Sequence, residues 1–160
     1  CRRLVLESAT PGLKHAADRE ARRGVDQAHA VRLETQDFAG FVEDWYSQPV
    51  FASLTQRPEL LTRVKDARRR NEPAELARAL RGMGTGVQEP LWDRLDELHM
   101  PTLFIAGALD GKYVEVGARM DALSEHVRAA VMPNAGHTVH AEYPKAYADL
   151  VRDFLQAPQP

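Results

Sequence analysis

The sequence contains one cysteine, no long apolar run and no marked excess of either charge. Cys1 alone cannot form an internal disulfide, which fits a reducing compartment, and we expect a cytoplasmic protein. No apolar stretch approaches the roughly 20 residues of a membrane-spanning helix. The 21 Lys and Arg against 23 Asp and Glu give a net charge of −2, without the basic surplus that nucleic-acid binding needs. We therefore expect neither a membrane span nor a nucleic-acid partner.

The remaining composition is that of a globular protein. Hydrophobic residues make up 44% and charged residues 28%, close to the average of soluble domains, and 160 residues suffice for one sizeable core. The chain begins without Met, directly before the apolar run 4–6, which is too short for a signal peptide. We therefore expect the 160 residues to be a piece of a longer protein.

Three short apolar runs predict buried strands, at 4–6, 102–106 and 127–132. Amphipathic helical patterns follow the last two, at about 114–123 and 144–155. Their apolar stripes are Val114, Ala118 and Ala122 in the first helix, and Tyr147, Leu150, Val151 and Phe154 in the second. This alternation of strand and helix implies right-handed crossovers and a parallel sheet.

Between the first two predicted strands, only helical patterns occur. We expect helices at about 16–34, 35–46, 58–70, 73–81 and 90–98, three of them with Pro in the first turn. The chain is thus predicted to consist of a core strand and loop at 1–13, a helical insertion at 14–98, and a C-terminal core at 99–160.

Two side chains suited to acid–base chemistry follow the second and third predicted strands. Asp110 comes just after 102–106, and His137 lies in a Gly-containing loop after 127–132. In open parallel sheets, sites form beyond the carboxyl ends of the strands. A carboxylate there could orient an imidazole that acts as a general base near neutral pH. Taken singly, Asp110 could equally be a turn or helix-cap residue, and His137 a surface loop residue.

A metal site formed by His137, His140 and Glu142 is a further possibility. Their spacing does not match the His-Glu-x-x-His zinc motif, and no cysteine contributes. We therefore expect no metal and no cofactor.

The order strand–Asp, helix, strand–His, helix resembles the C-terminal half of an α/β-hydrolase, whose catalytic triad runs Ser, Asp, His along the chain. A large helical insertion before the Asp strand fits the cap of that fold. The serines lie outside any G-x-S-x-G nucleophile motif: Ser8, Ser47, Ser53 and Ser124. The resemblance implies the C-terminal part of an α/β-hydrolase fold, a parallel sheet with flanking helices and a helical cap. The nucleophile half would then be missing, in the same or another chain.

Four stretches resemble one cofactor-free branch of this superfamily more specifically. They are ESATPGL at 7–13, WYSQPVFASL at 45–54, MGTGVQEPLW at 83–92 and GHTVHAEYP at 136–144. They are similar to the 2-succinyl-6-hydroxy-2,4-cyclohexadiene-1-carboxylate synthase family of menaquinone biosynthesis. The stretch at 45–54 is the most specific, because hydrolase caps do not generally share sequence, whereas the Gly-His loop would identify only the superfamily.

This resemblance implies a lyase. The family's Ser–His–Asp triad abstracts a proton from a cyclohexene ring and expels pyruvate, which leaves a conjugated diene. On the resemblance, His137 is the triad histidine and Asp110 its orienting carboxylate. Without the nucleophile half, we expect this chain alone to be inactive.

The resemblance also implies that Arg22, Trp45 and Arg68 bind substrate, although Arg69 and Arg70 leave the register of the second arginine open. An arginine can bind a carboxylate through two parallel hydrogen bonds, which suits a small polycarboxylate substrate. Trp45 could close the pocket over the ring or belong to the core of the cap.

Two other functions fit the same pattern. A different capped α/β-hydrolase, an esterase or a carbon–carbon bond hydrolase, would share the Asp–His pair but would not need the two arginines. A stand-alone fragment could instead be an interaction module, whose open sheet edge pairs with a strand of a partner.

Overall fold

The computed structural model describes residues 1–157, so residues 158–160 of the predicted C-terminal core lie outside the described part. The chain forms two compact units. The first contains Cys1–Thr10, Pro49–Leu60 and the described residues from Asp93 onward. The second contains Pro11–Gln48 and Leu61–Trp92.

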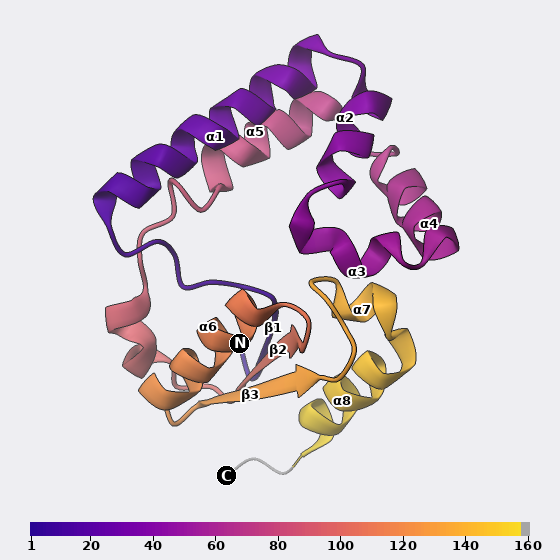
Figure 1. Ribbon diagram of the computed structural model, residues 1–160. Coiled ribbons are helices and arrows are strands. Elements are labelled where there is room, and N and C mark those ends of the chain that lie inside the picture. Colours follow the sequence, from indigo (N-terminus) through magenta and orange to yellow (C-terminus); the bar gives the residue numbers. More distant parts are fainter. Residues whose placement is uncertain (158–160) are drawn as a thin grey trace. The chain divides into compact units, whose positions relative to one another are not determined.

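A parallel sheet of three strands forms the first unit together with its helices (Figure 1). The strands are β1 (Leu4–Glu7), β2 (Thr102–Gly107) and β3 (Val127–Met132). β2 is the middle strand, and Thr102 lies opposite Leu4 on one side and Val127 on the other. The predicted strands and their parallel arrangement are confirmed.

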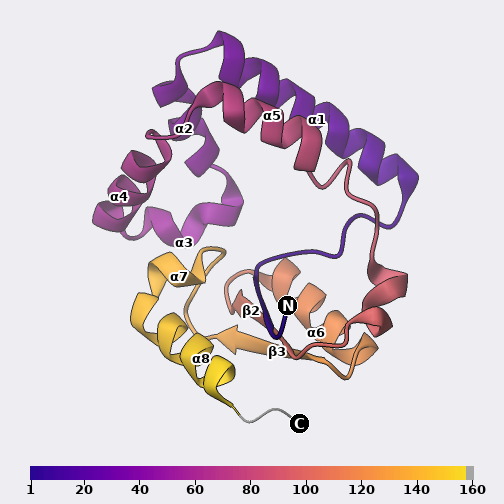
Figure 2. The same cartoon turned by 180° about the vertical axis from the view of Figure 1, so that it is seen from behind.

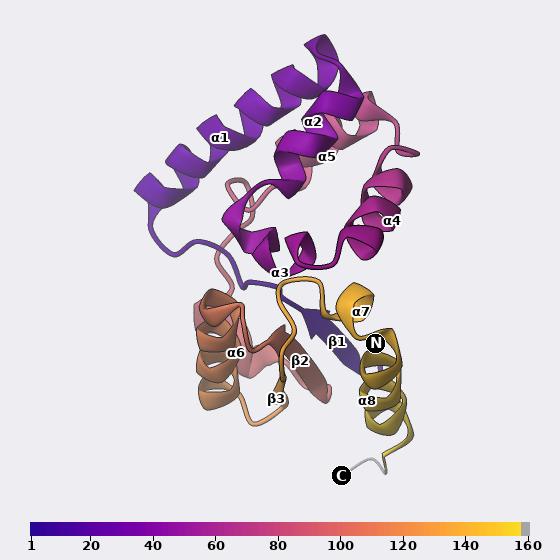
Figure 3. The same ribbon diagram turned by 45° about the vertical axis from the view of Figure 1, so that its right-hand side comes forward.

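Helices α6 (Gly111–Leu123) and α8 (Pro144–Gln156) flank the sheet on opposite sides (Figure 3). Alternate residues of β2 face them, as a strand buried on both faces requires. Leu103 and Ile105 belong to the cluster that packs against α8. The α8 side chains in that cluster are Tyr147, Leu150, Val151 and Phe154, so the predicted stripe of this helix is confirmed.

The predicted stripe of α6 is wrong, because Ala118 and Ala122 are exposed. The buried residues of this helix are Gly117 and Met120. A Cβ at Gly117 would lie 2.6 Å from the ring of Phe104, so the missing side chain lets the helix approach β2 closely. This approach, which apolar periodicity does not reveal, decides which face of α6 is buried.

The second unit is helical, and its long helix α1 (Ala16–Thr35) lies alongside α5 (Pro73–Met83) (Figures 1 and 2). A third helix, α2 (Phe38–Tyr46), starts where the Asp37 carboxylate accepts hydrogen bonds from two backbone N–H groups, a strong N-cap. The core of this unit is Ala30, Leu33, Phe41 and Ala77, with Phe38, Trp45, Leu76 and Leu80 packed against it.

The second unit does not coincide with the predicted insertion at 14–98. The first unit includes residues 49–60, which comprise the 3-10 turn η1 (Pro49–Phe51), the short helix α3 (Ala52–Thr55) and the start of α4 (Pro58–Arg68). Helical periodicity shows that a segment is helical, but it does not show against which unit the segment packs.

Short elements account for the remaining differences. η1, α3 and α7 (Val139–Glu142) have no predicted counterpart, since each is too short to show a helical period. The predicted helix at 90–98 is the 3-10 helix η2 (Trp92–Glu97). Within residues 1–157, no helix has both the length and the apolar character to cross a membrane.

Candidate active site

The loops that follow β2 and β3 approach each other closely at the carboxyl edge of the sheet. Ala108 N–H donates to the carbonyl of Met132, and Leu109 N–H to that of Ala135, each at 2.9 Å. Gly107, at the end of β2, permits this contact, because a Cβ there would overlap the backbone oxygens of Ala135 and Gly136. The two loops are therefore fixed against each other where the predicted acid–base residues lie.

Asp110 and His137 form a hydrogen-bonded pair at this edge. The distance between His137 Nδ1 and Asp110 Oδ2 is 2.6 Å. The carboxylate is 8% exposed and the imidazole 24% exposed. Asp110 occupies the N-cap position of α6, but its side chain makes no capping hydrogen bond. The carboxylate is thus directed to the imidazole, and it does not cap the helix.

Two aromatic rings enclose the imidazole. The ring centroid of Tyr113 lies 5.0 Å from that of His137, and that of Phe51 lies 5.9 Å away. Since Asp110 engages Nδ1, Nε2 is the nitrogen placed to accept a proton. Such an arrangement suits an imidazole to act as a general base and a carboxylate to orient it.

Several residues around His137 are not indicated by the sequence. Phe51 lies in a segment predicted to belong to the cap, and the Ser8 hydroxyl donates to the His137 carbonyl at 3.0 Å. The sequence suggests Glu142 only as a possible metal ligand, but Glu142 is buried and its carboxylate accepts a hydrogen bond from the backbone N–H of Gly136, in the loop of His137. The position of Tyr113, three residues after Asp110 and so one helical turn along, is the only signal in the sequence that could have suggested such a contact.

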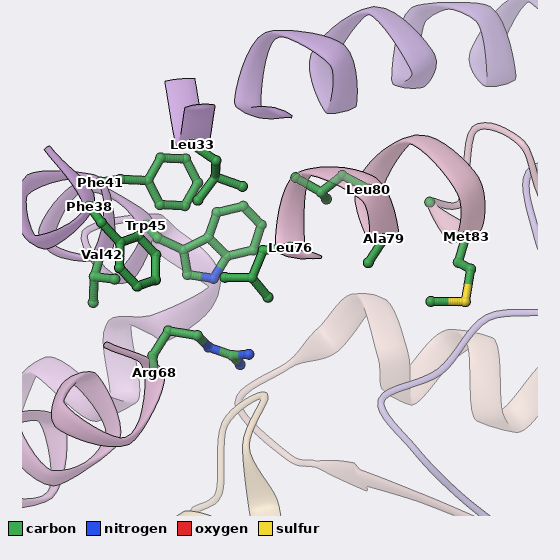
Figure 4. A pocket seen from close by; sticks show the side chains of 11 residues that line it. Leu33, Phe38, Phe41, Val42, Trp45, Arg68, Leu76, Ala79, Leu80 and Met83 are labelled. Carbon is green, nitrogen blue, oxygen red and sulfur yellow. The ribbon is translucent and has the colours of Figure 1, made fainter. Parts of the chain in front are cut away.

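Trp45 and Arg68 line a cavity of about 330 Å³ in the second unit. Most of its lining is apolar, and Arg68 is the one charged side chain among the labelled residues in Figure 4. Arg69, in contrast, pairs with Glu43 and Asp66. Of the adjacent arginines left open by the sequence, Arg68 is thus the one that lines this cavity. Trp45 also packs against the core of this unit, and closure over a substrate ring stays a prediction.

Arg22 does not line that cavity. Its Nε lies 2.8 Å from Oδ1 of Asp26, which is 3% exposed. His29 lies one turn further along α1, with its ring edge-on to Trp45. Burial lowers the pKa of His29, and the positive charge of Arg32 lowers it further.

No group of three or more His, Cys, Asp or Glu residues within the described range 1–157 could hold a metal ion. His140 instead contacts Glu7, whose carboxylate oxygens lie 2.9 Å from its Nδ1.

No protein-family model matches the chain. The 2-succinyl-6-hydroxy-2,4-cyclohexadiene-1-carboxylate synthase of Serratia proteamaculans is 36% identical over 157 residues, 97% of this chain and 58% of that protein. The structure of MenH from S. aureus superposes with a TM-score of 0.93 at 35% identity, over 97% of this chain and 59% of that one.

A more distant structure shows the fold alone. A thermophilic esterase from Thermogutta terrifontis, solved with malate bound, has a TM-score of 0.74 at 20% identity, over 97% of this chain and 56% of that one. The parallel sheet, its flanking helices and the Asp–His pair at its carboxyl edge identify the chain as a member of the α/β-hydrolase superfamily.

Within that superfamily, the chain is homologous to the 2-succinyl-6-hydroxy-2,4-cyclohexadiene-1-carboxylate synthases, and the resemblance found in its sequence is confirmed. The chain spans 56 to 58% of the length of the curated relatives that it matches.

Proposed function

We propose that the protein containing this chain is a lyase of menaquinone biosynthesis, which forms 2-succinyl-6-hydroxy-2,4-cyclohexadiene-1-carboxylate by eliminating pyruvate. The observation that carries this proposal is the contact between His137 and Asp110 at the carboxyl edge of the sheet, in a chain homologous to synthases of that name. Its location in the cytoplasm stays a prediction.

In the proposed reaction, His137 removes a proton from the substrate ring through Nε2. The electron pair of the broken C–H bond becomes a ring double bond. The bond between the ring and the leaving oxygen breaks, and protonation of the departing three-carbon unit gives pyruvate. Asp110 holds the proton of Nδ1 and stabilises the imidazolium that forms. We propose that the third triad member, a serine, comes from the part of such proteins that this chain does not span, in the same or another chain.

Arg68, Trp45 and Arg22 are the proposed substrate-binding residues. The cavity combines an apolar wall that includes Trp45 with one guanidinium, that of Arg68. A six-membered ring carrying a carboxylate matches that combination, because the ring is apolar and the carboxylate binds a guanidinium bidentately. The pairing of Arg22 with Asp26 would fix the direction of a second guanidinium.

A capped hydrolase is the second candidate, and the largely apolar lining of the cavity favours it. An ester with an apolar acyl group would fill such a space without needing Arg68. The two candidates share the Asp–His pair, so only the choice of substrate separates them.

The test is to supply the complete natural protein that contains this sequence with the synthase substrate, and separately with p-nitrophenyl butyrate. The lyase proposal expects continuous release of pyruvate, measured by a coupled reduction, and little release of nitrophenol. Ester hydrolysis without release of pyruvate would contradict it and favour the hydrolase.

A further inference from the structure

Glu142 is a buried carboxylate outside the Asp–His pair. It is 6% exposed and is the last residue of α7. Both of its carboxylate oxygens lie 3.1 Å from the backbone nitrogen of Gly136, the residue directly before His137. The carboxylate therefore holds the loop backbone immediately beside the proposed base.

Two hydroxyl groups also contact this carboxylate. Ser53 Oγ donates to Oε1 of Glu142 at 3.0 Å, and Thr138 Oγ1 donates to the same oxygen at 3.3 Å. These donors are neutral groups. A buried carboxylate held by neutral donors gives up its hydration without a salt bridge in return, so apolar packing would stabilise the fold at lower cost. The contacts are better explained by the geometry that they impose on the loop.

Ser53 brings a third chain segment, residues 49–60, to the loop of His137. A Cβ at Gly136 would overlap Ser53 Oγ and would lie 2.7 Å from Ser53 Cβ. Arg57, from the same segment, donates to the Glu142 carbonyl at 2.7 Å, and its guanidinium lies 4.5 Å from the centroid of the Tyr143 ring. Glu142 is thus held through both its side chain and its backbone.

The loop is also held on the other side of His137. Ser8 Oγ donates to the His137 carbonyl at 3.0 Å. Ser8 follows β1 with a φ of 43°, in the left-handed region that residues other than glycine rarely adopt. Side-chain hydrogen bonds therefore fix the backbone at Gly136 and at His137, on either side of the His137 Cα atom.

We propose that Glu142 is a positioning residue, which fixes the loop backbone so that the imidazole of His137 stays on Asp110. The proposal rests on the proposed function only in taking His137 as the base. Oε1 accepts hydrogen bonds from Ser53 Oγ, Gly136 N–H and Thr138 Oγ1, so a glutamine with its oxygen at that position keeps those three. An alanine keeps none.

The first test compares Glu142→Ala with Glu142→Gln in the complete natural protein. Misplacing a reacting group by about 1 Å can cost roughly 100-fold in rate, so E142A should lower kcat for pyruvate release at least about tenfold, with KM nearly unchanged. E142Q should restore kcat to within about threefold of wild type. Glu125→Gln, at a side chain that is 90% exposed, is the matched control and should match wild type.

The second test does not depend on activity. In wild type, the Gly136 amide should exchange slowly with solvent, and the His137 Nδ1–H proton should give a low-field NMR signal. E142A should accelerate the exchange and remove the signal, E142Q should keep both, and Ser53→Ala should accelerate the exchange to a smaller extent.

The positioning role is overturned if E142A leaves both the exchange and the signal as in wild type. It is also overturned if kcat falls only in proportion to the folded fraction, measured by circular dichroism. A wild-type protein that releases no pyruvate would refute the proposed function, while the exchange and NMR measurements would still decide the role of Glu142.

Discussion

The imidazole Nδ1 of His137 lies 2.6 Å from Oδ2 of Asp110, although 27 residues separate the two in the chain. Their contact follows from the sheet, because β2 and β3 are parallel neighbours and the loops after them share one edge. The carboxylate selects the tautomer with its proton on Nδ1, which leaves Nε2 to accept a proton.

Replacing Asp110 with Asn should lower kcat for pyruvate release by about 10³-fold or more with little change in KM. An amide no longer enforces the correct tautomer, and in serine protease triads the equivalent change costs about 10⁴-fold. Asp149→Asn, on the surface of α8, is the control and should match wild type. A D110N protein with kcat within tenfold of wild type would show that the pair does not act in the rate-limiting step.

Replacing Arg68 with Ala should raise KM for the synthase substrate about tenfold or more. Arg68 is the cation that lines the same cavity as Trp45. A hydrogen bond to a charged group contributes about 1.5–3 kcal/mol. Arg78→Ala removes an arginine that is 68% exposed and should leave KM unchanged. Equal KM values for the two variants would place the substrate carboxylates elsewhere.

Replacing Gly107 with Ala should destabilise the protein by about 1–3 kcal/mol, the usual cost of overpacking. The added Cβ would overlap backbone oxygens of Ala135 and Gly136, which cannot rotate away as a side chain would. Gly111→Ala meets no atom within 4 Å and should be neutral or slightly stabilising. Urea unfolding of both variants measures the difference, and equal stabilities would contradict the close approach of the two loops.

His29 should make the protein less stable as the pH falls. Burial and the charge of Arg32 lower its pKa in the folded state, so between that value and the unfolded pKa of about 6.5 the unfolded chain binds more protons. The contribution is therefore fully present above about pH 6.5 and is lost as the pH falls toward the folded pKa, by at most about 1.4 kcal/mol per pH unit.

The check is the free energy of unfolding in urea at pH 7.5 and pH 5.5. The comparison protein is His29→Phe, which keeps a ring beside Trp45. The unfolding free energy of wild type minus that of H29F should be smaller at pH 5.5 than at pH 7.5. The exposed His15 provides the control, since H15F should leave the pH dependence of wild type unchanged. The prediction fails if H29F and wild type lose equal stability between the two pH values.

The sequence was sufficient to predict the sheet, because strands buried on both faces appear as continuous apolar runs such as 102–106. The helices of ten or more residues were predicted for a similar reason, since each shows several turns of apolar period. The order of Asp110 and His137 along the chain was also visible, because each lies in the loop that follows a predicted strand. Local patterns of this kind are encoded within a few residues.

The contacts between distant segments were not visible in the sequence. The face of α6 against β2 depends on the close approach of Gly117 to Phe104, and no periodicity reports such a fit. The position of residues 49–60 in the first unit depends on bonds from Ser53 and Arg57 to Glu142. In the sequence, nothing distinguishes a buried Glu such as Glu142 from an exposed one, so its role required the structure.

The most direct test of the central claim is the rate of pyruvate release by His137→Gln and His140→Gln in the complete natural protein. The two histidines are three residues apart, but only His137 contacts Asp110, whereas His140 contacts Glu7. With His137 as the base, H137Q should lose at least about 10³-fold in kcat, and H140Q should stay close to wild type. An H137Q protein that keeps a tenth or more of the wild-type rate would contradict the claim.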